Sequence, residues 1–289
     1  MKSSIGAFVV MSALALTVVP ARAQWPSYPT GAPRTPEGKV DMAAPTPRTA
    51  DGKPDFSGVW DVTRVAGGRG GAQAQAPPQA PAQAPPPPEG PPPSDGPPLA
   101  TFFNIGANMK DGLPLQPWAA EVLNKRKSEN SKDNPDAHCL PMGLMQFHLH
   151  PQPRKILQMP KEIVIIYEAN LGLRQIYLDG RSLPGKDVEP WWFGYSIGHW
   201  DGDTLVVETT GYRDDVWLDV WGTPMTSAAK TIERMRRINY GTMQTDITID
   251  DPKAFTKPFT VRVNHRLSPD NELIEFICQD RDAPHYVGK

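Results

Sequence analysis

From residue 155 onward, the chain is a succession of short runs in which apolar and polar residues alternate, with Gly, Pro, Asn or Asp between the runs. Alternation places successive side chains on opposite faces, as in a half-buried β-strand. Runs that recur at intervals of about ten residues are typical of an antiparallel sandwich or barrel. The expected strands cover residues 162–168, 173–178, 194–200, 203–210, 230–238, 243–250, 259–267 and 272–280.

The run 259–267 shows how alternation assigns faces: Phe259, Val261, Val263, His265 and Leu267 share one face. Neither a βαβ alternation nor a glycine-rich phosphate loop occurs in the chain. One helix is predicted over 116–129, where a proline is followed by good helix formers. We therefore expect a mainly β fold, a single antiparallel barrel or sandwich with one helix and long irregular N-terminal segments.

The N-terminal third differs in composition. Residues 1–23 combine a lysine, an apolar run and small residues before the expected cleavage point, which predicts a signal peptide. Residues 24–50 are expected to be irregular, and residues 51–289 to form the β-rich domain. A Pro/Ala/Gln/Gly-rich insertion at 66–98 has too few apolar residues to offset its ordering entropy, so we expect it to be disordered.

These features predict a periplasmic or secreted protein. The apolar run of the leader is shorter than the roughly 20 residues that a membrane span needs, so no membrane span is expected. Cys139 and Cys278 are the only cysteines, and an oxidising compartment favours a disulfide between them. The formal net charge of −2 argues against a nucleic-acid partner and leaves a small molecule as the expected one.

The stretch WFGYSIGHWDGDTLVVETTGY (192–212), with WLD at 217–219 and ERMRR at 233–237, resembles a large secreted bacterial family of unassigned activity. The family signature is approximately G-R/H-W-E/D-G-D-T-L-V-V. The resemblance implies a periplasmic or secreted β-rich domain and no particular activity. Two positions depart from the pattern: His199 stands where arginine is usual, and Leu183 where a histidine commonly follows D-G-R.

A second, shorter stretch, GVW at 58–60, resembles the G-x-W that opens the lipocalins. In that family the tryptophan closes one end of an eight-stranded barrel. The resemblance therefore favours a lipocalin-like barrel over a sandwich.

Two aspartates in the family signature, Asp201 and Asp203, could belong to a metal-binding D-x-D motif or to a turn. A glycine between two alternating runs favours a two-residue hairpin turn. With Asp201 and Gly202 in the turn, Trp200 pairs with Asp203 and His199 with Thr204. We therefore interpret the two aspartates as part of a turn.

The strands beside this turn carry acid–base groups. Tyr195, His199 and Glu208 share one face of the hairpin, and His265 lies on the apolar face of its own strand. If both faces line one cavity, these four residues could move protons on a bound molecule. The alternative interpretation is that the histidines have only structural roles at the rim of a barrel.

Aromatic and basic residues suggest ligand binding. Trp192, Trp200 and Trp217 could stack on an aromatic or apolar molecule, and Arg234 or Arg236 could bind an acidic group on it. Packing of the tryptophans in the core and solvation of the arginines on a strand are the alternatives.

The segment HCLPMGLMQFHLH (138–150) is rich in metal-binding residue types. In an extended chain His148 and His150 would point the same way, which suits copper or zinc. The alternative is a surface segment without metal, and the leading expectation is that the protein needs no cofactor.

Three hypotheses about function follow from these residues. The first is a periplasmic barrel that binds a small apolar or aromatic molecule. The second is a cofactor-free lyase, isomerase or hydrolase that uses His/Glu acid–base chemistry in the same pocket. The third is a periplasmic copper- or zinc-binding protein. Whether the protein is an enzyme is left open by the sequence.

Overall fold

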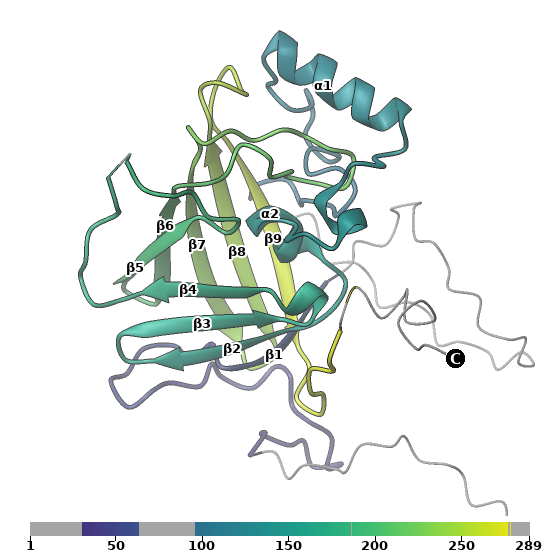
Figure 1. Ribbon diagram of the computed structural model, residues 1–289. Helices are drawn as coiled ribbons and strands as arrows, with labels where there is room; N and C mark the ends of the chain where they lie inside the picture. The colour runs from purple at the N-terminus through teal and green to yellow at the C-terminus, as the bar shows by residue number, and fades with distance from the viewer. Residues whose placement is uncertain (1–30, 64–95, 186, 277, 279–289) are drawn as a thin grey trace, which may run out of the picture.

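The computed structural model describes residues 31–63, 96–185, 187–276 and 278, and over these residues the chain forms a closed barrel of nine strands in sequence order (Figure 1). The predicted mainly β barrel is thus confirmed. The predicted signal peptide and almost all of the Pro-rich insertion lie outside the described residues. The strands are β1 (Gly58–Val62), β2 (Arg154–Met159), β3 (Glu162–Tyr167), β4 (Leu173–Tyr177), β5 (Tyr195–Asp201), β6 (Thr204–Thr210), β7 (Lys230–Asn239), β8 (Thr242–Asp250) and β9 (Phe259–Leu267).

Neighbouring strands pair antiparallel at every position but one, and β1 pairs with β9 to close the barrel. Strands β4 and β5 run parallel and share only two residue pairs, Ile176 with Ser196 and Tyr177 with Ile197. A parallel pair cannot be joined by a tight hairpin, which explains the long connection between these strands. The seam is therefore the part of the barrel with the fewest backbone hydrogen bonds to hold it.

The barrel interior is layered. An apolar cluster at one end includes Met243 of β8 and Leu267 of β9, and a second cluster includes Ile247 of β8 and Val263 of β9. Between the two clusters, each of these strands turns a polar residue inward: Thr245 on β8 and His265 on β9, both almost completely buried. A layer of buried polar side chains thus separates two apolar layers.

The tryptophan of the G-x-W stretch lies in the first apolar cluster. Trp60 is fully buried, and its indole N–H donates to the carbonyl of Phe56 at 2.9 Å. The guanidinium of Arg237 stacks 4.9 Å from the Trp60 ring. A buried indole with its N–H satisfied and a cation on its face is a stable arrangement.

The helices are α1 (Pro117–Ser128) and α2 (Leu144–Leu149), with short 3₁₀ turns η1 (Pro135–His138) and η2 (Ala169–Leu171). Helix α1 confirms the predicted helix and lies beyond the ends of β8 and β9 (Figure 1). The indole N–H of Trp118 on α1 donates to the backbone carbonyl of Lys253 in the loop between these strands. No described helix is long and apolar enough to cross a membrane.

Helix α2 corrects the expectation of an extended segment at 138–150. All six of its residues are buried, and three of them, Leu144, Met145 and Leu149, pack in the second apolar cluster. The helix is buried on every side, including its polar side chains Gln146 and His148, and six residues are too few for a helical period to be visible in the sequence.

The prediction of a strand at 272–280 is also wrong for the described residues of that range, because residues 271–276 have no regular secondary structure. In a closed barrel β9 already pairs with β8 and with β1, so no edge remains for a further strand. The predicted disulfide is confirmed: Cys139 is bonded to Cys278, with their Cα atoms 5.5 Å apart.

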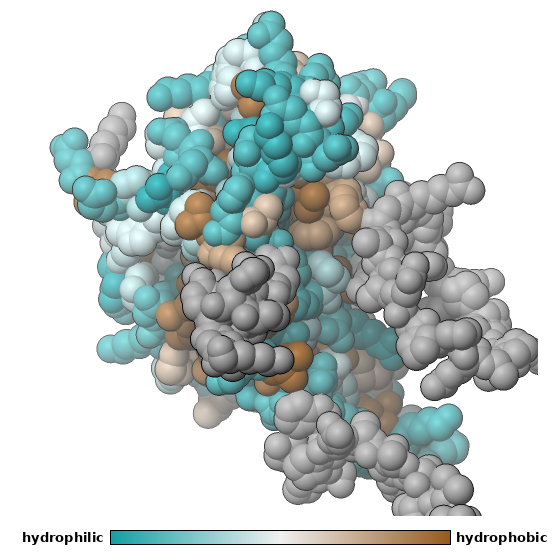
Figure 2. All heavy atoms as spheres, turned by 45° about the vertical axis from the view of Figure 1, so that its right-hand side comes forward, coloured by the Kyte–Doolittle hydropathy of each residue, from teal (hydrophilic) through white to brown (hydrophobic). Residues whose placement is uncertain are grey.

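Figure 2 shows a face on which apolar side chains occur in small groups among hydrophilic ones. Exposed apolar residues scattered in this way are ordinary on a protein surface. The part of this face that Figure 2 shows uncovered therefore has no broad apolar patch.

Candidate functional site

The hairpin formed by β5 and β6 has a turn, as predicted, but in a different register. Asp201 pairs with Thr204, so the turn consists of Gly202 and Asp203, and His199 pairs with Val206 instead of Thr204. Gly202 has a φ of +59°, which a glycine adopts without strain. Each residue of the first strand thus pairs with a residue two positions further along the second strand than expected.

The two aspartates bind separate arginines on the surface. Asp201 accepts from Arg234 at 2.8 Å, and Asp203 forms an ion pair with Arg48 at 2.6 Å. All four side chains are about half exposed or more. The aspartates thus stabilise the ends of the hairpin, as a turn interpretation requires.

The predicted acid–base residues are not brought together. Tyr195, His199 and Glu208 do share a face, but it is the outer face of the barrel, whereas His265 is 1% exposed in the interior. Outside, the Tyr195 hydroxyl accepts from Arg181 at 3.1 Å, and Glu208 forms an ion pair with Lys230 at 2.6 Å. The expected single cavity is therefore not formed.

The reason is the parity of the two strands. Ser196, Leu205, Val207 and Thr209 occupy the inner face of β5 and β6, and all four are buried. The residues that alternate with them have to point outward.

The predicted ligand-binding arginines also point outward. Arg234 pairs with Asp201, and the Arg236 guanidinium lies 3.7 Å from the Asp246 carboxylate on the surface. Trp200 faces inward and stacks on Phe56 with ring centroids 5.6 Å apart. These three residues do not meet at one site.

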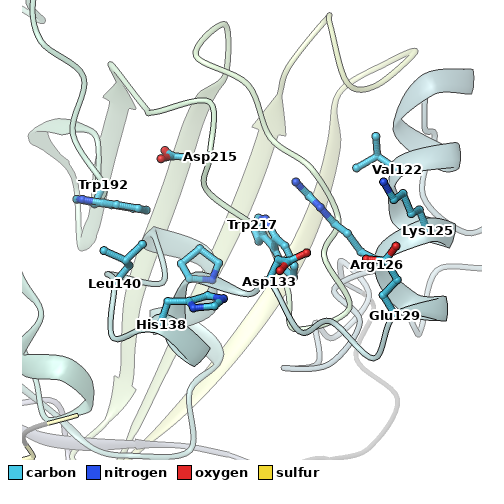
Figure 3. Close-up of a pocket in the computed structure, with 11 residues that line it drawn as sticks. Val122, Lys125, Arg126, Glu129, Asp133, His138, Leu140, Trp192, Asp215 and Trp217 are labelled. Atoms are coloured by element: carbon cyan, nitrogen blue, oxygen red, sulfur yellow. The ribbon is translucent and has the colours of Figure 1, made fainter. Parts of the chain in front are cut away.

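The other two predicted residues, Trp192 and Trp217, line one groove of about 390 Å³ (Figure 3). This volume lies in the range of sites for small molecules. Its walls come from α1, from the segment after α1 and from the loops beside β5 and β6. The lining residues are Val122, Lys125, Arg126, Glu129, Asp133, Pro135, His138, Leu140, Trp192, Asp215 and Trp217.

Figure 3 shows Trp192 and Leu140 at one end of the groove and the α1 side chains Lys125 and Arg126 at the other, with Trp217 between them. The Arg126 guanidinium lies 4.2 Å from the centre of the Trp217 ring and donates to the carbonyl of Gly222 at 2.8 Å. Burial lowers the pKa of Arg126 from its usual value. The groove thus combines aromatic surface with a partly buried cation.

A buried carboxylate holds the loop under Trp217. Asp219 is fully buried and accepts from the backbone N–H groups of Ile105, Gly222 and Thr223, each at 3.0 Å, and from the Thr223 hydroxyl at 2.7 Å. Four donors on one carboxylate fix the turn that carries Trp217. The aromatic wall of the groove is therefore rigidly supported.

The barrel interior contains a charged cluster that the sequence hypotheses missed. Glu233 of β7 is fully buried and accepts from Arg174 of β4 through both carboxylate oxygens, and from His148 Nε2 of α2 at 2.9 Å. Arg174 also donates to the hydroxyls of Ser196 and Thr209, each at 3.1 Å. Arg174 thus connects β4 with β5, β6 and β7 across the parallel seam.

The charges of this cluster follow from its surroundings. Burial by itself raises the pKa of Glu233, but the charge of Arg174 and the hydrogen bonds from His148 and Arg174 outweigh it and hold that pKa well below its usual range. Burial lowers the pKa of His148 more than Glu233 raises it. The cluster therefore consists of an ionised Glu–Arg pair with a neutral imidazole that donates to the carboxylate.

The predicted metal-binding pair is not formed. Because α2 is helical, His148 points to Glu233, while the His150 ring lies against Phe102 with centroids 5.0 Å apart. Nδ1 of His150 accepts from the backbone N–H of Gln152 at 3.3 Å. No group of three or more His, Cys, Asp or Glu side chains that could hold a metal occurs in the described part of the chain.

One signal in the sequence could have found the charged cluster. Alternation places Arg174 beside Ile176 on β4, and Glu233 beside Met235 on β7, so both charged residues fall on apolar faces. Two opposite charges on inward faces indicate a buried ion pair. The groove has no such signal, because its walls meet only in the tertiary structure.

Comparison of the chain with protein-family models, with curated proteins and with solved structures found no match. Function is therefore inferred from the groove and from the barrel interior.

Proposed function

We propose that this chain is an exported β-barrel protein that binds a small apolar or aromatic molecule with an acidic group in the groove between α1 and the barrel. The observation that carries the proposal is the placement of Trp192 and Trp217 in one hollow of about 390 Å³ together with Arg126. Indole rings supply a large apolar contact area, and a guanidinium binds a carboxylate or phenolate.

The charges of the groove support an acidic ligand. Of its three carboxylates, Asp215 has Arg213 as a basic partner at 2.8 Å and Glu129 has Lys132 at 3.4 Å, while the charge of Asp133 acts on Arg126. Lys125 forms no ion pair with any described residue. Lys125 and Arg126 are therefore the groups that an acidic ligand would meet on α1.

Export is part of the same proposal. The predicted signal peptide and the Cys139–Cys278 disulfide both favour a periplasmic or secreted location. Fractionation of cells that express the full chain tests this, and the mature protein is expected outside the cytoplasm with both cysteines oxidised.

The geometry favours binding over the acid–base alternative, because Tyr195, His199 and Glu208 lie outside the barrel and His265 lies inside it. Copper or zinc binding, the third hypothesis, gains no support from the positions of His148 and His150, whose rings contact Glu233 and Phe102, and elemental analysis of the purified protein tests it.

Binding is tested with two naphthalene probes, the anionic 1-anilinonaphthalene-8-sulfonate and the neutral N-phenyl-1-naphthylamine. We expect the anionic probe to quench tryptophan fluorescence and to bind at least tenfold more weakly to Trp192→Ala. Lys125→Ala is expected to weaken the anionic probe only.

The matched control is Trp118→Ala, which removes an exposed indole of α1 that does not line the groove. It should leave the affinity for both probes unchanged. Equal affinity of the anionic probe for the wild type and for Trp192→Ala would refute the proposed site.

A further inference from the structure

The polar layer of the barrel contains several buried polar atoms that have no hydrogen-bond partner among the described residues. They are Nε of Arg154, the hydroxyl of Tyr167, both ring nitrogens of His265 and the hydroxyl of Thr245. The side chains of these four residues are all about 2% exposed or less. An unpaired polar atom in a protein interior is costly, and such atoms usually bind something that completes them.

Most of these atoms are donors. Nε of Arg154 only donates, the Tyr167 hydroxyl has a proton to donate, and a neutral imidazole such as His265 carries one N–H. The charged side chains that influence Tyr167 are Arg154, Arg174 and Glu233. A guanidinium offers no acceptor for the hydroxyl proton, and both oxygens of the Glu233 carboxylate already accept from Arg174 and His148. What is missing from this part of the interior is therefore an acceptor.

The positive charge of Arg154 also indicates a missing acceptor, and one with a negative charge. Its Nη1 donates to the carbonyl of His148 at 2.9 Å, and its Nη2 to the carbonyls of His150 and Gln152 at 2.8 and 3.1 Å. No described carboxylate forms an ion pair with it, whereas the charge of Arg174 is matched by Glu233. The Asp61 carboxylate acts on Arg154 without forming an ion pair, so one guanidinium charge in the polar layer has no directly bound counter-charge, which is unfavourable in a protein interior.

Contacts of Arg154 and of His148 connect the donor side chains. Arg154 and Tyr167 are direct partners on β2 and β3, and the guanidinium lies 5.9 Å from the Tyr167 ring centre. The centre of the His265 ring lies 6.3 Å from the centre of the His148 ring, and the backbone carbonyl of His148 accepts from Arg154. Burial and the positive charge of Arg154 lower the pKa of His265 well below its usual value.

We propose that the barrel interior binds one small monovalent anion, of the size of a halide or formate, between Arg154, Tyr167 and His265. Such an ion accepts hydrogen bonds from all three donors and neutralises the Arg154 charge. A water molecule in the same place would satisfy donors but leave the charge uncompensated. The site differs from the groove, because none of these three residues lines it.

The test uses the mature, disulfide-bonded protein in sodium gluconate, whose anion is too large for an interior site. Chloride, bromide or formate replaces gluconate at constant ionic strength while the thermal midpoint Tm is recorded. We expect a saturable rise of Tm, because a ligand that binds only the folded state stabilises it. Line broadening of the ³⁵Cl nuclear magnetic resonance signal reports chloride binding directly.

Tyr167→Phe removes one donor without removing a hydrogen bond to the described protein, so it is expected to weaken chloride binding at least tenfold and to flatten the rise of Tm. The control is Tyr212→Phe, in which the lost hydroxyl has a partner, Thr231, at 2.6 Å. The control should lower Tm in gluconate and keep the response to chloride.

Two outcomes would overturn the proposal. One is a wild-type Tm that is the same in gluconate, chloride, bromide and formate. The other is chloride line broadening of equal strength for the wild type and for Tyr167→Phe.

Discussion

The carboxylate of Glu233 on β7 binds the guanidinium of Arg174 on β4 through both oxygens, and neither side chain is more than 1% exposed. Strands β5 and β6 lie between these two residues in the barrel. The ion pair therefore spans the parallel seam, where β4 and β5 share only two residue pairs.

Removal of one partner of this pair is expected to be severe. Glu233→Gln leaves the Arg174 charge buried without a counter-charge, which costs about 3–5 kcal/mol in the free energy of unfolding. Urea unfolding measures the loss. Arg234→Gln, the exposed neighbour that binds Asp201, is the control and should cost at most about 1 kcal/mol. Similar losses in the two variants would contradict a stabilising role of the buried pair.

The stability of the fold should decrease as the pH falls below neutrality. Burial lowers the pKa of His150 from 6.5 to about 4 and that of His265 well below its usual value. Between its pKa in the folded chain and its higher pKa in the unfolded chain, such an imidazole binds fewer protons in the folded state. The free energy of unfolding therefore rises with pH in that range. The contribution of His150 is complete above about pH 6.5 and is lost progressively as the pH falls to about 4.

The Glu233 carboxylate adds a second acid-sensitive contribution. Its pKa is lowered in the fold, so its contribution is complete above the ordinary value of 4.5 and is lost below it. Thermal unfolding between pH 8 and 3 checks both effects. His150→Gln should show a shallower fall of Tm between pH 6.5 and 4 than the wild type, and parallel curves would show that His150 does not titrate in this way.

Gly143, at the start of α2, should tolerate no side chain. Its φ is +83°, and a Cβ atom there would lie 2.2 Å from Cγ1 of Val216. Gly143→Ala is therefore expected to destabilise the protein by more than the roughly 1–2 kcal/mol that a left-handed residue alone costs. Gly180→Ala is matched, because φ is +81° and nothing lies within 4 Å of the added carbon. The difference in the free energy of unfolding between the two variants, measured by chemical unfolding, isolates the steric effect. Equal losses of stability would contradict the close approach of Gly143 to Val216.

Local alternation in the sequence was enough to predict the barrel strands and the faces of several of them. On β9 the residues from Phe259 to Leu267 that were expected to share an apolar face do face inward. The turn at Gly202 and the helix α1 were likewise visible, because glycine and proline act on the backbone beside them. These properties depend on neighbours in the chain.

Which residues meet at one site was decided by the tertiary structure alone. Alternation shows that Tyr195 and His199 share a face, but only closure of the barrel, with β1 paired to β9, decides that this face is the outer one. Helix α2 and the groove depend on contacts between segments far apart in the chain, as between Arg126 and Trp217. A side-chain period describes one strand or helix, whereas a site is formed by packing between elements, and that packing is fixed only when the whole barrel closes.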